Sequence, residues 1–442
     1  MTTTSAKPSA LRAVMDVRRE ELPLALLMAA HFFLVITVFW ILKPIKKGLF
    51  IQYYDEGGFT LLSWTMTASQ AELLAKVLNM VVAAVAVAVF TWLARRYRRQ
   101  QLSYIFCTFF LMSCLGYALI VDRPSGATVW SFYLFGDLFS TLMVATFFAF
   151  LNDSVTPDAA RRLYGVIVFG GVAGGVFGST TVRAFIKSLG TAEWLWVCIG
   201  LIALTIGVAW GASRFVRTTA GPRTEPPVPS TAAGNPALEG ARLVFASPYL
   251  LAIAGIVGFY EIVSTVMDFQ FTSTVSHYLE GPAIGAQFAT VFAITNAIAM
   301  FVQLFLTSFV MTRFGVGTAL LVLPVLAAGG SLGFAALPTL WMGSGLNTID
   351  NAFSYSINQS AREALYTPTS TEEKYKAKAF IDMFVQRFAK AVAVGVSLAI
   401  TTYFSDFSSI RWLSLFTVAV IALWVVAARY AGRHFARMTD GR

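Results

Sequence analysis

Long apolar runs alternate with short polar stretches along almost the whole chain. A helix needs about 20 predominantly apolar residues to cross the hydrocarbon core of a bilayer. Twelve runs reach that length, at roughly 21–42, 70–94, 101–121, 127–150, 163–186, 192–212, 249–275, 286–311, 316–337, 341–363, 377–402 and 410–430. Because a backbone in hydrocarbon must satisfy its own hydrogen bonds, each run predicts a transmembrane helix.

The composition agrees with this pattern. Hydrophobic residues make up 57% of the chain and charged residues only 13%, whereas soluble domains carry about 25% charged residues. No small-residue cleavage site follows the first run, so we expect it to stay as the first helix rather than leave as a signal peptide. The sequence therefore predicts an all-α membrane protein.

Lysine and arginine gather in alternate loops, as they do in the cytoplasmic loops of membrane proteins. The basic stretches include 95–99, 161–162, 214–223 and 374–378, together with both ends of the chain. We therefore expect both termini to be cytoplasmic, in a protein of the bacterial inner membrane. The net charge of +10 then reflects the basic cytoplasmic loops. We therefore expect the chain to interact with the lipid bilayer and not with a nucleic acid.

The longest interruption is 213–247, whose Pro, Gly, Ser and Thr content predicts a flexible cytoplasmic linker. It separates an N-terminal segment, 1–20, and a six-helix half, 21–212, from a second half, 248–431, and a tail, 432–442. An internal repeat supports the division, because "GDLFSTL" at 136–142 matches "DNAFSYS" at 350–356. Two six-helix halves resemble the plan of the major facilitator superfamily, in which substrate binds between the halves near the bilayer midplane. We expect a monomer.

No enzyme chemistry is predicted. The three histidines are scattered, the three cysteines lie inside apolar runs, and neither set has the spacing of a metal site or a catalytic triad. The glycine-rich stretch "VFGGVAGGVFGS" at 168–179 lacks the strand and the Lys-Ser/Thr ending of a phosphate-binding loop. Small residues four apart in an apolar helix instead predict close packing against another helix, either sliding or static. We expect no metal and no cofactor.

Ionisable residues inside membrane helices are costly and commonly functional. Besides Lys43, Lys46 and Lys47 near the end of the first run, the set comprises Glu72, Lys76, Asp137, Arg183, Glu261, Asp268, Asp350, Asp382, Arg387 and Lys390. Glu72 and Lys76 are spaced to pair on one helix face, and Lys43 and Lys47 are spaced to anchor the helix at the interface. Asp137, Asp382, Arg387 and Lys390 could also be structural ion pairs between helices.

Four stretches resemble the ADP/ATP translocases of plastids and energy-parasitic intracellular bacteria. They are "ILKPIKK" at the end of the first run, "AELLAK" at 71–76, "GDLFSTLMVATFFAFLND" at 136–153 and "KAKAFIDMFVQRFAKAVA" at 376–393. The resemblance implies nucleotide exchange by two lysines and two acids. It places the first-helix lysine at Lys46, the fourth-helix acid at Asp137 and the eleventh-helix lysine at Lys390.

The remaining family acid has no counterpart. The seventh-helix motif falls on "STVMDFQF", with Val266 or Met267 near the acid and Gln270 at a lysine position, while Asp268 and Glu261 lie close enough to substitute.

We accordingly assign Lys46, Lys390, Arg387 and Asp137 to binding of a small anionic solute, with ATP or ADP as the leading candidate. Glu72, Lys76, Glu261, Asp268, Asp350 and Asp382 are assigned to coupling or charge compensation. Two alternatives remain: a proton-driven exporter of another solute that uses Asp137 or Glu261, and a membrane receptor that transports nothing.

Overall fold

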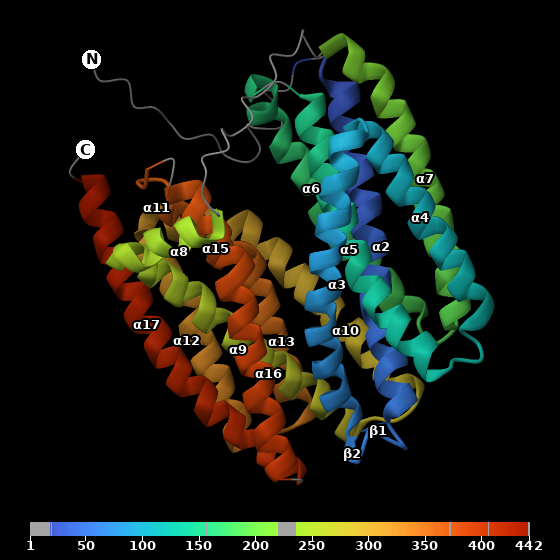
Figure 1. Ribbon diagram of the computed structural model, residues 1–442, viewed down its shortest axis with the longest axis vertical. Coiled ribbons are helices and arrows are strands. Elements are labelled where there is room, and N and C mark those ends of the chain that lie inside the picture. Colours follow the sequence, from blue (N-terminus) through green and yellow to red (C-terminus); the bar gives the residue numbers. More distant parts are fainter. Residues whose placement is uncertain are drawn as a thin grey trace. The chain divides into compact units, whose positions relative to one another are not determined.

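The computed structural model describes residue 18 and residues 20–155, 157–219, 236–370, 373–404 and 406–440. Nearly all of this is helical (Figure 1). The elements are α2 (Leu22–Tyr54), β1 (Phe59–Leu61), β2 (Trp64–Met66), α3 (Ala68–Arg96), α4 (Arg99–Ile120), α5 (Gly126–Ser154), α6 (Pro157–Phe185), α7 (Thr191–Thr219), α8 (Pro236–Ala246), α9 (Pro248–Tyr278), α10 (Pro282–Phe301), η1 (Val302–Leu306), α11 (Thr307–Arg313), α12 (Gly315–Ala336), α13 (Leu340–Phe353), η2 (Ser354–Asn358), α14 (Gln359–Leu365), η3 (Glu373–Ala377), α15 (Lys378–Phe380), η4 (Ile381–Val385), α16 (Gln386–Tyr403), η5 (Phe407–Ser409) and α17 (Ile410–Asp440).

Every predicted span corresponds to a helical segment. Within the described residues, eleven helices are long and apolar enough to cross a membrane. The remaining predicted span, 341–363, is the helical run of α13, the π-helical turn η2 and α14. π-helical turns also interrupt the spans around α10 and α16, and such turns are frequent at functional sites.

Several boundaries differ from those that the sequence predicts. The first apolar run ends near residue 42, and the sequence places Lys43, Lys46 and Lys47 near the outer end of its helix; α2 continues to Tyr54, so the three lysines lie well inside it. A short antiparallel hairpin, β1 and β2, follows α2, although the sequence predicts only helices. The expected linker 213–247 is partly helical, because α7 reaches Thr219 and α8 occupies Pro236–Ala246. Its middle, 220–235, lies outside the described residues, and the expected tail is largely part of α17.

The chain forms two compact units. Unit 1 comprises 1–53, 78–226 and 285–293, and unit 2 comprises 54–77, 227–284 and 294–442, as far as these ranges are described. The units follow the two predicted halves except for two segments. The hairpin and the first turns of α3 belong to unit 2, whereas the middle of α10 belongs to unit 1.

In unit 1, α4 packs against α5 and α7 around buried aromatic residues such as Phe110 and Phe139. The glycine-rich face of α6 lies directly on α2, where a Cβ added at Gly178 would be 2.7 Å from the Thr37 carbonyl oxygen. Thr37 also donates a hydrogen bond from its hydroxyl to the Gly174 carbonyl, 3.2 Å away. The predicted close packing of α6 is confirmed. Through this contact α6 supports α2, the helix that carries Lys46.

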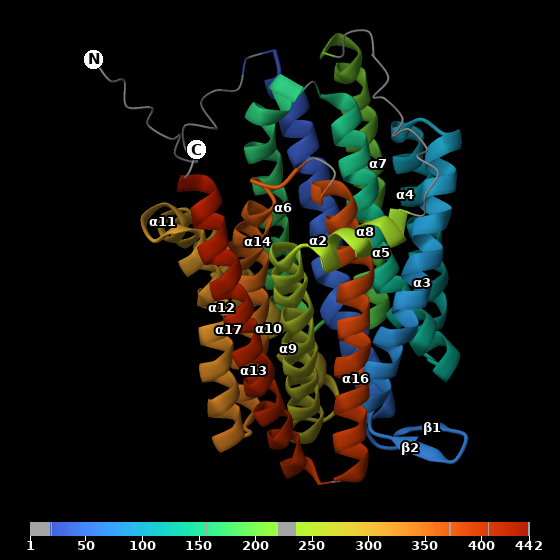
Figure 2. The ribbon, with the colours of Figure 1, turned by 60° about the vertical axis from the view of Figure 1, so that its left-hand side comes forward.

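In unit 2, α9 is the central helix, with α13, α16 and α17 packed around it. Trp424 and Phe269 are fully buried in the core that these helices share. The short helix α8 packs on η3 and α15, and Figure 2 shows it lying crosswise to the long helices α9 and α16. Lys376 of η3 forms a 2.6 Å ion pair with Glu239 of α8. The helices α9 and α16 pack side by side. Glu261 and Asp268 lie on α9, and Arg387 and Lys390 lie on α16.

Candidate functional site

Lys46 is a buried cation in unit 1, with a side chain that is only 5% exposed. Its ammonium group forms an ion pair with Asp137 of α5, donates a hydrogen bond to the Tyr133 carbonyl 3.4 Å away, and lies 4.4 Å from the centre of the Tyr133 ring. Gly136 makes room for the lysine, because a Cβ there would lie 2.5 Å from Cδ of Lys46. The structure thus brings together two of the residues that the sequence assigns to substrate binding.

Of the two lysines that the sequence predicts as interfacial anchors, Lys47 is buried and Lys43 is partly exposed. Lys47 is only 5% exposed, and its ammonium lies 5.2 Å from the Phe288 ring. Lys43 places its ammonium 4.4 Å from the Trp40 ring and 4.8 Å from the Phe292 ring. An anchoring lysine extends its charge into water, so the anchor interpretation is wrong for Lys47, because α2 continues past it and places it among packed helices.

Lys76 forms the centre of an ionic cluster in unit 2. Glu72, four residues earlier on α3, lies 2.9 Å from its ammonium, as the spacing predicts, and Asp268 of α9 forms a second ion pair with it. Asn347 of α13 donates a hydrogen bond to the other oxygen of Asp268, at 3.0 Å. The cluster therefore connects three helices through one ammonium and two carboxylates, and Glu72 is fully buried.

Lys390 and Glu261 form the second charged pair of unit 2, with Nζ and Oε1 3.1 Å apart. Gln386, one turn before Lys390 on α16, donates to the other oxygen of Glu261 at 3.0 Å. The Glu261 side chain is 9% exposed and that of Lys390 is 36% exposed. The carboxylate is thus held from one helix face, while the Lys390 side chain remains partly accessible.

The other predicted residues are spread over unit 2. Asp350 is buried on α13 and accepts a 2.6 Å hydrogen bond from Ser264 of α9. Asp382 on η4 and Arg387 on α16 are half-buried, and Arg387 precedes Lys390 by three residues. Among the described residues, no group of three or more His, Cys, Asp or Glu side chains is arranged to hold a metal ion.

Gln270, which stands at a lysine position of the resembled family, is part of the core. Its side chain is fully buried and donates to Ser414, at 2.8 Å, and to the Ile410 carbonyl, at 3.1 Å. Position 270 therefore supports the contact between α9 and α17. The nearby acids that the sequence offers as substitutes, Asp268 and Glu261, each hold a lysine instead.

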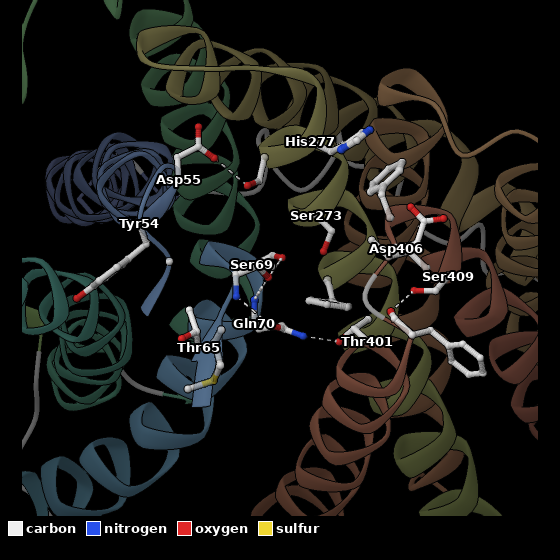
Figure 3. Close-up of a pocket in the computed structure, with 18 of the residues that line it drawn as sticks. Tyr54, Asp55, Thr65, Ser69, Gln70, Ser273, His277, Thr401, Asp406 and Ser409 are labelled. Carbon is white, nitrogen blue, oxygen red and sulfur yellow. Dashed lines mark hydrogen bonds between the residues drawn. The ribbon is translucent and has the colours of Figure 1, made fainter. Parts of the chain in front are cut away.

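Sequence reasoning missed the neutral partners of these charges. Gln386 lies four residues from Lys390 and could have been found as an i, i+4 neighbour. Asn347 and Ser264 gave no such signal, because each meets its acid across two helices. A polar cavity beside the hairpin, drawn in Figure 3, was also missed, since its lining comes from three distant parts of the chain.

These pairs have a defined chemical capacity. An ammonium that is held by a carboxylate in a site with little water can exchange that carboxylate for another anion at small net cost, because the charge remains paired throughout. Lys46 and Lys390 are each paired with a carboxylate, in separate units, and only Lys46 is shielded from water. A phosphate group is an anion with enough acceptor oxygens to replace a carboxylate at either lysine.

Comparison with known proteins places these residues in context. Residues 332–435 match the model of the TLC ATP/ADP transporter family. The chain is 22% identical over 338 residues to the chloroplastic ADP,ATP carrier protein 2 of Arabidopsis thaliana, covering 68% of this chain and 54% of that one. It is 24% identical over 345 residues to ADP,ATP carrier protein 1 of Chlamydia muridarum, covering 69% and 65%. The chain thus spans about half the length of the plastid relatives that it matches.

Solved structures show the same architecture at low identity. A nucleoside transporter aligns with a TM-score of 0.64 at 14% identity, over 94% of this chain and 99% of that one. A D-xylose–proton symporter aligns with a TM-score of 0.61 at 14% identity, over 93% and 97%. A transporter of the major facilitator superfamily, in its outward conformation, aligns with a TM-score of 0.52.

The resemblance noted in the sequence is therefore confirmed: this chain is an integral membrane protein of the major facilitator fold that is related to the ADP/ATP carriers of plastids and chlamydiae and matches the ATP/ADP transporter family over residues 332–435.

Proposed function

We propose that this chain is a secondary transporter that exchanges nucleotides of the ATP/ADP type across a bacterial membrane by alternating access. The relatives named above are ADP,ATP carriers, and the fold is that of solved transporters. The observation that carries the proposal is the buried pair of Lys46 and Asp137. In this pair, a buried ammonium group on a membrane-spanning helix lies next to a carboxylate that can move away from it.

A nucleotide must lose much of its hydration to enter a site in the membrane. Charge-assisted hydrogen bonds from lysine to phosphate oxygens replace that hydration. Asp137 is 27% exposed, against 5% for Lys46, so its carboxylate can turn to water when a phosphate takes its place on the ammonium. Without substrate, the same carboxylate neutralises the lysine and limits the cost of burying it.

Lys390 and Glu261 offer the same exchange in unit 2. In the proposed mechanism each lysine binds phosphate oxygens and each acid is displaced on loading. That both lysines bind one nucleotide remains a prediction of the sequence, and transport by the single and double variants tests it. A substrate can shift a conformational equilibrium only by its difference in affinity for the two states, and the displaced carboxylates supply such a difference.

Besides a binding site, alternating access requires contacts that can open and close. Contacts at the start of α3 meet this requirement. Within unit 2, Lys76 pairs with Asp268 of α9, and Gln70 donates to Thr401 of α16 at 2.9 Å. All four side chains are polar and the contacts between them are non-covalent, so the contacts can break and form again. We propose that these contacts hold the closed state at the membrane face opposite the basic loops and separate when that face opens.

Transport by the purified chain in liposomes tests the proposal. Labelled ATP should enter liposomes loaded with ADP and fail to accumulate in empty ones, because an exchanger needs a counter-substrate. Uptake that depends on a pH gradient, and not on internal nucleotide, would favour the proton-coupled exporter. Absence of transport for ATP, ADP and simple phosphate esters, with folded protein in the liposomes, would refute the proposed substrate class.

A further inference from the structure

A cavity of about 610 Å³ lies in unit 2 beside the hairpin. We call it the hairpin cavity; its lining comes from residues within 54–70, 269–277 and 401–410. The helices α9 and α16 end there, and α3 and α17 begin there. Since helix ends meet the aqueous border of a membrane, a charged ligand can reach this cavity from water.

The lining carries negative charge without a matching cation. Asp55, Glu56 and Asp406 contribute three carboxylates, and the described lining contains neither lysine nor arginine. The ring of His277 stacks on Phe407, with centroids 3.7 Å apart. Three helix C-termini, of α2, α9 and α16, and two N-termini, of α3 and α17, lie at the cavity, so the helix dipoles supply no net positive charge. The carboxylates therefore determine the sign of the potential, which attracts cations.

Ser273 gives an independent sign of a missing ligand. Its side chain lines the cavity and is only 5% exposed, yet its Oγ has no hydrogen-bond partner among the described residues. The hydroxyls on either side along α9 behave differently: Thr272 donates to the Asp268 carbonyl at 2.8 Å, and Thr274 donates to the Gln270 carbonyl. Leaving a buried hydroxyl unpaired costs about 1–3 kcal/mol, and a ligand N–H at the cavity floor would remove that cost.

Figure 3 shows how these groups are arranged. Ser273 lies between Asp55 and Gln70 on one side and Asp406 on the other. Gln70 is already engaged, because it accepts from the Thr67 N–H at 2.9 Å and donates to Thr401 at 2.9 Å. The group on the cavity floor that can accept a hydrogen bond from a ligand is therefore the Ser273 oxygen. At the rim, the carboxylates can accept such bonds.

We propose that the hairpin cavity binds a small organic ammonium ion of the polyamine class. An ammonium group fits an acceptor hydroxyl below it and carboxylates around it, and aromatic rings such as Phe269 and Phe404 suit its methylene chain. The volume lies within the range of about 300–1,000 Å³ that is typical of sites for small organic ligands. A bare metal ion is disfavoured, because no three His, Cys, Asp or Glu side chains of the described lining are close enough together to hold one.

Asp55 supports this assignment. It accepts a 3.0 Å hydrogen bond from Ser276, and its partial burial raises its pKa, to which the carboxylates of Glu280 and Glu56 add. A raised carboxylate pKa indicates a negative charge that lacks compensation in the folded protein. A bound ammonium ion would supply that compensation.

The ligand would also act on the hairpin. Asp55 and Gln70 are connected to α9 and α16 through Ser276 and Thr401. A polyamine that contacts both sides would strengthen this connection, so it should slow any opening there and inhibit transport. This last step rests on the proposed function, whereas binding itself does not.

Isothermal titration of the full chain with spermidine, in nucleotide-free buffer, tests the proposal. Asp55→Asn and Asp406→Asn should each weaken binding about tenfold, because each removes a charge-assisted hydrogen bond. Ser273→Ala should weaken it roughly three- to tenfold without loss of fold, since it removes a hydroxyl that has no partner. Asp122→Asn, an exposed acid in the loop after α4, is the matched control and should bind as the original chain does.

Thermal unfolding of each variant without ligand verifies that it is folded. The proposal is overturned if the original chain does not bind spermidine, if all four variants bind it equally, or if Mg²⁺ binds as tightly as spermidine. Binding that follows the predicted order while transport of nucleotides fails would sustain this inference and reject the proposed substrate instead.

Discussion

The pair of Lys46 and Asp137 yields the sharpest prediction, because its two members differ in exposure. The lysine side chain is 5% exposed and that of the acid 27%. Asp137→Asn leaves a buried ammonium without its carboxylate, and the loss of one partner from a buried pair costs about 3–5 kcal/mol. Lys46→Gln leaves a carboxylate that water can reach, so it should destabilise the protein by only about 1 kcal/mol.

Transport should follow the opposite order. Removing the Lys46 ammonium takes a charge-assisted hydrogen bond, worth about 1.5–3 kcal/mol, from a bound phosphate, and this corresponds to roughly a 10- to 150-fold loss in transport efficiency. The double variant with Gln at 46 and Asn at 137 has no buried charge at this place. It should regain stability and remain inactive.

Thermal unfolding in detergent and nucleotide uptake per folded protein measure the two effects separately. Lys43→Gln is the matched control, since it removes a cation from the same helix that lies over the Trp40 ring; it should change uptake at most about fivefold. Full uptake by Lys46→Gln, or recovery of uptake in the double variant, would show that the pair is only structural.

Three further predictions concern other parts of the molecule. Gly178→Ala should destabilise the protein by roughly 1–3 kcal/mol in thermal unfolding, because its Cβ would meet the α2 backbone at 2.7 Å, whereas Gly200→Ala, with open space around it, should be neutral or stabilising; equal effects would refute the close contact. The hydrogen bond from Arg162 holds the pKa of Glu21 below its ordinary value. Its stabilisation is therefore complete above the unfolded pKa of about 4.3 and lost as pH falls through the lower folded value. Glu21→Gln should lower the unfolding temperature at neutral pH, and its difference from the original chain should shrink as pH falls below about 4.3; a difference that does not shrink in acid would contradict this assignment. Lys390→Gln should impair uptake per folded protein and also lower the unfolding temperature, because the Glu261 side chain that loses its cation is only 9% exposed; uptake equal to that of the original chain would remove Lys390 from the site.

The sequence predicted the helices well and their ends less well. Apolar runs are determined by the bilayer thickness, so each appears as a helical segment. The predicted first span ends too early, at about residue 42: the apolar "GLFIQYY" continues α2 to Tyr54, and Lys47 is buried as a result. The hairpin was missed because strands of three residues have no periodicity to detect.

The candidate site was also predicted only in part, because a sequence shows which residues are charged but not which residues they meet. Lys46, Asp137 and Lys390 stand out in a sequence because charge inside an apolar run is rare. The partner of each charge is another matter. Glu72 was found for Lys76 through its helical spacing, but Asp268 is 192 positions from Lys76 and only the packing of α3 on α9 brings them together.

By itself the sequence determined that this protein is a bundle of membrane-spanning helices, because hydropathy and helical hydrogen bonding depend on residues that are close in the chain. It also identified the rare buried charges. Only the tertiary structure decided which acids on other helices pair with Lys46, Lys76 and Lys390. It also showed that Gln270 supports the core and that Ser273 faces a cavity. Those outcomes depend on contacts between helices that are distant in the chain, and no local pattern encodes the distances at which such side chains meet.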